Sequence, residues 1–227
     1  MSKFGIGGAH PGGITLTKKI FEPEKINSTT HILDVGCGTG QTAAFLSSQY
    51  GAKVTGLDVN PIMIEKAKER MTKHRLPVKI IQASIEQCPL QESSFDFILS
   101  ESVLLFVDKP KALREVFRLL KIGGKLIANE LTLRKQLPTA NQEEIKQFYG
   151  INTLLTEKDW AELFLQSGFK NLMIRNETNS INQVQSLPEI QFSDTIEPEL
   201  YGVFYQHLMI MAKYQQTFDY GIFSCTK

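Results

Sequence analysis

A glycine-rich turn between a predicted strand and a predicted helix constrains this chain of 227 residues more than any other feature. Residues 31–35 have the short apolar pattern of a strand, and residues 41–50 have the pattern of a helix. Gly36, Gly38 and Gly40 lie between them. Glycines in such a turn let a ligand approach the backbone closely and reach the amide groups at the start of the helix. The sequence therefore predicts a loop that binds a nucleotide-like cofactor.

The rest of the chain alternates short strand-like runs with longer helical patterns. This alternation is typical of a parallel sheet covered by helices, which predicts the α/β class. The further predicted strands are residues 53–58, 78–82, 95–100, 125–131, 171–176 and 218–226. The further predicted helices begin at Pro61, near Lys109, after the capping residue Thr156 and at Pro198. A turn is expected at Gly123 and Gly124, before the fifth strand.

Two polar stretches interrupt the alternation, at about residues 132–155 and 179–195. Long excursions of this kind often cover a binding site. We therefore expect an N-terminal arm or lid over residues 1–29 and one domain over residues 30–227 that carries these two insertions.

Composition and charge exclude several classes of protein. Lys and Arg number 25 against 24 Asp and Glu, so we expect no nucleic-acid partner. No window of about 18 apolar residues predicts a membrane span, and residues 1–13 lack the pattern of a secretory signal. Three widely spaced cysteines, Cys37, Cys88 and Cys225, argue against a zinc site or a disulfide framework. A cytoplasmic monomer or homodimer without a metal is expected.

The acidic residues near the glycine turn indicate which cofactor binds there. Asp58 ends the second predicted strand, where a carboxylate can accept hydrogen bonds from ribose hydroxyls, and Val59 and Met63 can contact an adenine. Asp34 precedes glycines that are spaced GxGxG. A carboxylate is unfavourable beside a pyrophosphate but suits the ammonium and sulfonium groups of S-adenosylmethionine. These charges favour the sulfonium cofactor over a dinucleotide.

With these motifs the sequence resembles the class I S-adenosylmethionine-dependent methyltransferases, in the small-molecule branch that includes quinone-biosynthesis C-methyltransferases. The resemblance runs over residues 32–130 and continues more weakly over residues 156–169. It implies a Rossmann-like, doubly wound sheet of seven strands, with helices on both faces and with residues 218–226 as an antiparallel last strand.

The resemblance also implies the roles of single residues in cofactor binding. Gly36, Gly38 and Gly40 would lie against the methionine and the ribose, and Asp58 would bind the ribose hydroxyls. The residues implied at the adenine edge and at the methionine end are Ser84, Ile85 and Ser100. Ser84 departs from the family pattern, which often has an acidic residue there.

Catalysis by such an enzyme depends mainly on positioning and on the exclusion of water, because the methyl group is already activated. If the acceptor must lose a proton, the candidate bases are Glu101, His10 and Glu130; the two glutamates lie at strand ends, where open α/β sheets bind ligands. Tyr149 and Trp160 are candidate walls of an apolar substrate pocket. His207 is expected to be a core or rim residue.

Three other functions stay open at this point. A nicotinamide-dependent oxidoreductase would need GxGxxG spacing. A nucleic-acid or protein methyltransferase of the amino-methylating type usually carries an Asn/Asp-Pro-Pro-aromatic segment where this chain has residues 100–103, Ser-Glu-Ser-Val. A protein that binds S-adenosylmethionine without catalysis would have the same motifs. We expect a methyltransferase whose product is S-adenosylhomocysteine and whose acceptor is a small, partly apolar molecule.

Overall fold

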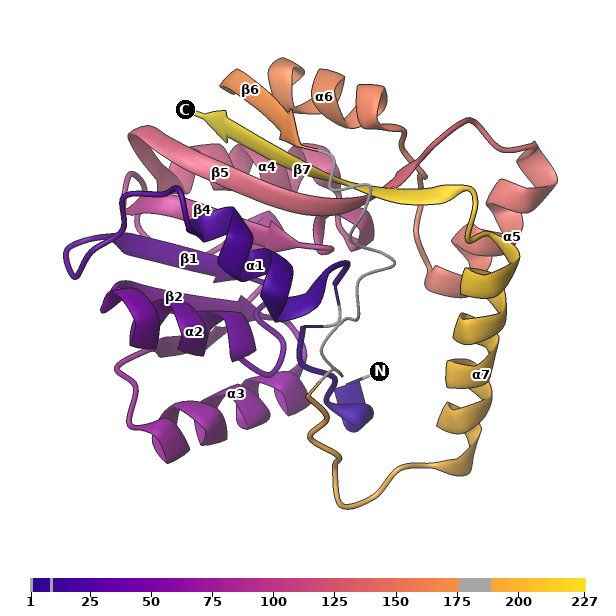
Figure 1. Cartoon of the computed structure of the whole chain (residues 1–227), viewed down its shortest axis with the longest axis horizontal. Helices are drawn as coiled ribbons and strands as arrows, with labels where there is room; N and C mark the ends of the chain where they lie inside the picture. The colour runs from indigo at the N-terminus through magenta and orange to yellow at the C-terminus, as the bar shows by residue number, and fades with distance from the viewer. Residues whose placement is uncertain (1, 9, 176–188) are drawn as a thin grey trace.

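The computed structural model describes residues 2–8, 10–175 and 189–227, and these residues form a seven-stranded sheet at the centre of the molecule (Figure 1). The strands are β1 (His31–Val35), β2 (Lys53–Asp58), β3 (Lys79–Gln82), β4 (Phe95–Glu101), β5 (Leu120–Leu133), β6 (Lys170–Arg175) and β7 (Phe218–Thr226). Their order is β3-β2-β1-β4-β5-β7-β6. Strands β1 to β5 pair in parallel, and β7 pairs antiparallel with β5 and β6. The predicted Rossmann-like sheet with an antiparallel last strand is confirmed.

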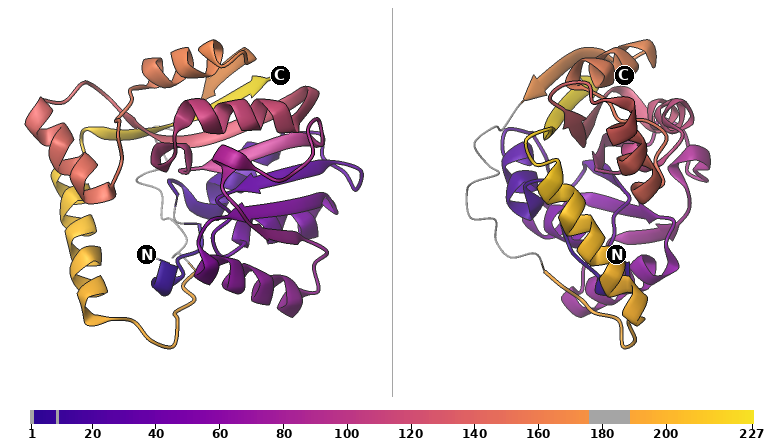
Figure 2. Two further views of the ribbon diagram at one scale, coloured as in Figure 1. Left: turned by 180° about the vertical axis from the view of Figure 1, so that it is seen from behind. Right: turned by 90° about the vertical axis from the view of Figure 1, so that its right-hand side faces the viewer.

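Helices cover both faces of the sheet, as Figure 2 shows from behind and from the side. The described helices are α1 (Gly13–Phe21), α2 (Gln41–Tyr50), α3 (Pro61–His74), α4 (Lys109–Leu119), α5 (Thr139–Tyr149), α6 (Glu157–Gln166) and α7 (Pro198–Lys213). Helices α1, α2 and α3 pack on one face, and α4 and α6 pack on the other. Within this described part of the chain, no helix is long and apolar enough to cross a membrane.

The central strands are apolar on both sides because both sides are covered. Ile32 and Leu33 follow one another in β1 and are both fully buried, Ile32 against α1 and α2 and Leu33 against α4. Parallel strands that are covered on both faces therefore have continuous apolar runs instead of alternating ones. This is why residues 31–35 were recognisable as a strand.

The fifth strand is longer than predicted. It begins at Leu120, which pairs with Phe95, and it includes the predicted turn at Gly123 and Gly124. The Lys227 amide donates to the Gly124 carbonyl at 3.0 Å, so the end of the chain pairs with this segment. Gly123 has a φ of +74°, and the register between β4 and β5 shifts between Phe95 and Phe97, so the predicted turn is an irregularity inside a paired strand. The local sequence does not indicate this long-range pairing.

The N-terminal residues and the two insertions gather at one end of the sheet. Helix α1 buries Leu16, Ile20 and Phe21 in the core. Residues 5–7 pair with residues 189–191, which belong to the second predicted insertion; residues 179–188 of that insertion lie outside the described residues. Helices α5 and α7 share a small apolar core and stand beyond the sheet (Figures 1 and 2). Helices α5 and α7 thus build a wall beside the strand ends.

Candidate active site

A cavity of about 530 Å³ lies over the carboxyl ends of β1, β2 and β4. Ligands bind at this edge in open α/β sheets, since the loops that follow the strands meet there. Its walls come from the glycine turn, from N-terminal residues, and from α5 and α7 on the far side. Residues that are distant in the sequence therefore enclose one space.

The predicted cofactor loop lines this cavity through Gly36 and Gly38. The Asp58 carboxylate accepts the Gly38 amide hydrogen at 2.9 Å and the Asn60 amide hydrogen at 2.8 Å. Asp58 thereby joins the end of β2 to the turn after β1, and Asn60 caps α3 with its side chain. The predicted apolar residues Val59, Met63 and Ile85 line the cavity beside this turn.

Unpaired polar atoms in the wall test whether S-adenosylmethionine fits the cavity. Among the described residues, the Asp34 Oδ2 atom and the hydroxyls of Thr39 and Ser102 are buried without a hydrogen-bond partner. Burial, and next the charge of Glu101, holds the pKa of Asp34 well above its usual range. A cationic ligand would offset the free-energy cost of burying the Asp34 carboxylate, because its charge compensates that of the carboxylate. The carboxylate and the two hydroxyls can accept hydrogen bonds, so they fit a ligand with an ammonium, a sulfonium and ribose hydroxyls.

Glu101 joins three segments above the sheet. Its carboxylate accepts from the Thr17 hydroxyl of α1 at 2.7 Å and from the Thr42 hydroxyl of α2 at 2.9 Å. The His10 Nε2 atom lies 3.3 Å from Glu101 Oε2, and both side chains are almost fully buried. The Asn129 amide also donates to the Pro11 carbonyl at 3.0 Å. These contacts hold the N-terminal segment against the cavity, and they bring together His10 and Glu101, two of the predicted candidate bases.

Comparison with known proteins identifies the family. Residues 33–128 match the family described as a methyltransferase domain. The whole chain is 36% identical, over 227 residues, to a Bacillus subtilis (strain 168) protein named uncharacterized methyltransferase YodH, and the match covers 97% of that protein. The chain is a class I S-adenosylmethionine-dependent methyltransferase. Its predicted enzyme class and its predicted cofactor are therefore confirmed.

More distant proteins are also similar to this methyltransferase. Phosphoethanolamine N-methyltransferase 1 of Arabidopsis thaliana is 28% identical over 182 residues, which are 80% of this chain and 37% of the plant protein. A structure of Haemonchus contortus phosphoethanolamine N-methyltransferase 2 in complex with S-adenosyl-L-methionine superimposes with a TM-score of 0.75 at 20% identity, over 94% of this chain and 51% of the other. The second likeness shows the fold alone.

Four of the residues predicted for the site do not line the cavity of the methyltransferase. Gly40 packs against Met71 and Ala67 on α3. The Ser84 hydroxyl accepts the Glu86 amide hydrogen and caps the short helical turn Ile85–Gln87. The other two are Ser100 and Glu130, which lie in the core behind the cavity and bond to each other.

Glu130 anchors the loop that follows β4. One oxygen of its fully buried carboxylate accepts the Ser100 hydroxyl at 2.9 Å, the Leu104 amide at 3.1 Å and the Val103 amide at 3.3 Å. Burial is the largest influence on its pKa and raises it from the ordinary 4.5 to about 7. The loop it holds carries Ser102 and Val103 into the cavity wall.

This raised pKa makes the stability of the methyltransferase depend on pH. Between about pH 4.5 and pH 7 the unfolded state releases the Glu130 proton while the folded state keeps it. The free energy of unfolding therefore falls as the pH rises through this range.

We expect this fall to amount to up to about 3 kcal/mol in wild type and to be absent in Glu130→Gln, which has no proton to release. Urea unfolding of the cofactor-free protein at about pH 5 and about pH 7.5 measures the difference. Equal pH dependence in wild type and variant would contradict the assignment, and Glu65→Gln, on the surface of α3, is the control.

Two aromatic candidates have different locations. Tyr149 lines the cavity, as predicted for a pocket wall, whereas Trp160 is fully buried in the core between the sheet and α6. His207, expected at the core or rim, also lines the cavity. The sequence did not indicate the remaining apolar wall, because its residues come from separate segments. They are Ile6, Leu105, Phe106, Val107, Leu131, Met211 and Phe218.

Proposed function

We propose that this methyltransferase transfers the methyl group of S-adenosylmethionine to a small-molecule acceptor that binds in the same cavity. The observation that carries the proposal is the division of the wall. Carboxylates and glycines line one part, and mostly apolar side chains line the part next to α5 and α7. A volume of about 530 Å³ is within the range of small-ligand sites. The predicted relation to quinone-biosynthesis C-methyltransferases stays a prediction.

The proposed cofactor contacts follow from the cavity wall. Gly36 and Gly38 would lie against the methionine and ribose, and Asp58 would accept from the ribose hydroxyls. Asp34 and Glu101 would face the cationic groups of the cofactor. The side chains proposed to flank the adenine are Val59, Met63 and Ile85.

The bound cofactor supplies a methyl group that its positive sulfur has already activated. The protein must therefore orient the acceptor and keep water out, which the N-terminal segment over the cavity supports. His10 and Glu101 are the proposed pair for accepting a proton where the acceptor must lose one, because they are in contact and both line the cavity. For Glu130, which lies behind the wall, we propose a positioning role through the loop it anchors.

The proposal is tested first at the cofactor site. We expect Asp58→Ala to bind S-adenosylhomocysteine about 100-fold more weakly than wild type, since two hydrogen bonds to a charged group are lost. Isothermal titration calorimetry measures this, with Glu65→Ala on the exposed side of α3 as the control variant. Equal binding by wild type and Asp58→Ala would show that Asp58 does not hold the ribose.

The acceptor class is tested with the same variants. Wild-type protein is incubated with a metabolite extract and with S-adenosylmethionine that is labelled in its methyl group. We expect labelled small molecules to form. The Asp58→Ala variant should give far less label, and Glu65→Ala should match wild type. Label that enters only protein or nucleic acid would overturn the proposal of a small-molecule acceptor.

A further inference from the structure

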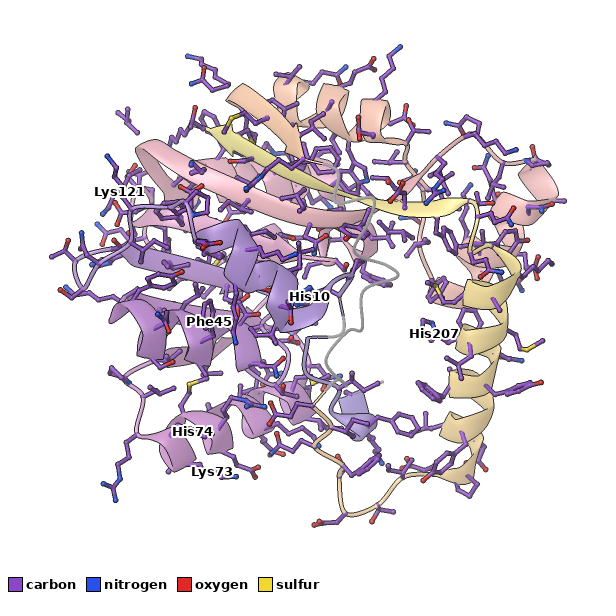
Figure 3. All side chains as sticks on the ribbon, viewed as in Figure 1. His10, Phe45, Lys73, His74, Lys121 and His207 are labelled. Atoms are coloured by element: carbon purple, nitrogen blue, oxygen red, sulfur yellow. The ribbon has the colours of Figure 1, made fainter. Side chains whose placement is uncertain are left out.

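Tyr149 and His207 form a polar pair in the apolar part of the cavity wall. Tyr149 ends α5 and His207 lies in α7, and the Tyr149 Oη atom is 2.8 Å from His207 Nδ1. Both half-buried side chains line the cavity. Figure 3 shows His207 on the side of α7 that faces the sheet, across from His10. The first insertion and helix α7 thus place one polar group opposite the cofactor loop.

The pair leaves one nitrogen for a ligand. The contact with Tyr149 uses Nδ1, and within the described residues His207 Nε2 has no hydrogen-bond partner. A neutral imidazole can donate or accept at this nitrogen, according to which of its nitrogens carries the hydrogen. Burial lowers the pKa of His207 and raises the pKa of Tyr149 to about 12. Both groups are therefore uncharged near neutral pH.

The charged residues of the cavity wall disfavour an anionic ligand. The described lining residues include no Lys or Arg, and residues 176–188 contain neither in their sequence. Asp58 and Glu101 line the same cavity, so a phosphate or carboxylate would be repelled and would lack a counter-charge. A neutral ligand with an apolar body avoids both costs.

We propose that Tyr149 and His207 are the acceptor-binding group of this cavity and that they bind the hydroxyl of a neutral, mostly apolar molecule such as a phenol. His207 bonds to the hydroxyl, and Tyr149 is a positioning residue that orients the imidazole. The apolar body of the acceptor packs on the neighbouring side chains, among them Phe106 and Met211. This inference rests on the proposed small-molecule function and narrows its substrate class.

Calorimetry with three probes tests the inference on protein saturated with S-adenosylhomocysteine. The probes are 2-naphthol, 2-methylnaphthalene, which lacks the hydroxyl, and phosphoethanolamine, which carries a phosphate. We expect wild type to bind 2-naphthol about 10-fold more tightly than 2-methylnaphthalene, as one hydrogen bond to a buried group would give. Phosphoethanolamine is expected to give no binding. Phosphoethanolamine binding as tight as that of 2-naphthol would overturn the inference.

Variants separate the hydroxyl contact from general packing. His207→Leu and Tyr149→Phe are expected to weaken binding of 2-naphthol and to leave that of 2-methylnaphthalene almost unchanged, with the larger loss for His207→Leu. Tyr205→Phe, at an exposed position of α7, should behave as wild type. Unchanged affinity for S-adenosylhomocysteine shows that each variant is folded.

The possible failures are distinguishable. If S-adenosylhomocysteine binds normally and both variants bind 2-naphthol as tightly as wild type does, this inference is overturned. The proposed function is not affected by that result. Absence of 2-naphthol binding by wild type overturns it as well. Failure of the proposed function would instead appear as missing label in small molecules in the extract experiment.

Discussion

Gly38→Ala is expected to weaken cofactor binding at least about 100-fold while the protein stays folded. Gly38 has a φ of +53°, and a Cβ atom there would meet no atom within 4 Å, because it would project into the open cavity. The left-handed conformation costs an alanine about 1 kcal/mol, so the loss of stability should be small. The methyl group would occupy space that the cofactor needs, and we expect S-adenosylhomocysteine to bind at least about 100-fold more weakly, a change that calorimetry measures.

Gly36→Ala is the matched variant, in the same turn and with a similar φ of +65°. Its Cβ would clash with Val103 Cγ2, in the loop that Glu130 anchors. Overpacking adds to the backbone cost, so we expect a loss of about 2–4 kcal/mol in the free energy of unfolding, measured with urea. The double variant Gly36→Ala/Val103→Ala should recover the packing part.

Either of two results would contradict this account of the turn. If Gly38→Ala bound S-adenosylhomocysteine like wild type, the turn would not be in contact with the cofactor. If Gly36→Ala were no less stable than Gly38→Ala, the expected clash with Val103 would not lower the free energy of unfolding.

Trp160→Ala is expected to cause the largest loss of stability, about 3–5 kcal/mol, because it removes a fully buried aromatic side chain. Trp160 stacks on Phe164 with ring centroids 5.8 Å apart and packs on Phe223 of β7 at 6.3 Å. Its indole nitrogen donates to the Leu131 carbonyl at 3.0 Å. The substitution therefore leaves a cavity and removes a hydrogen bond to the Leu131 carbonyl, and denaturant unfolding reports the sum.

Two control variants identify the cause of this loss. Trp160→Phe keeps a ring but lacks the indole donor, and we expect a smaller loss, of about 1–3 kcal/mol. Leu165→Ala removes an apolar side chain that is 53% exposed on the same helix and should change the stability by less than about 1 kcal/mol. A loss for Trp160→Ala no larger than that for Leu165→Ala would contradict the core assignment.

Much of the fold could be predicted because its signals are local. Strands β1, β2 and β7 and helix α2 have the predicted bounds, since apolar runs end where glycine or a capping residue stops them. The predicted capping of α6 is also present, with reciprocal bonds between Thr156 and Asp159. The start of β5 at Leu120 was not predicted, because its pairing depends on Phe95 and on Lys227.

The candidate site, too, has features with local signals, which could be predicted, and features that depend on long-range contacts, which could not. Gly36, Gly38 and Asp58 line the cavity, because each lies at or just after the end of a strand and parallel strands end at one edge, and their contacts with the cofactor stay predictions. Glu101 also lies there, but its bond to Thr17 spans 84 positions and the Tyr149–His207 pair spans 58. Periodicity describes the face of one element and contains no information about which distant element packs against it.

The sequence by itself therefore determined the sheet, the glycine turn and the identity of the methyl donor, since turn geometry and the charge of Asp34 and Asp58 act over a few residues. The tertiary structure alone decided which side chains enclose the rest of the cavity. In the folded chain Ser100 and Glu130 lie behind the wall, and Tyr149 and His207 are part of it. The physical reason is that burial and contact between distant segments depend on how the whole chain packs, which no local pattern specifies.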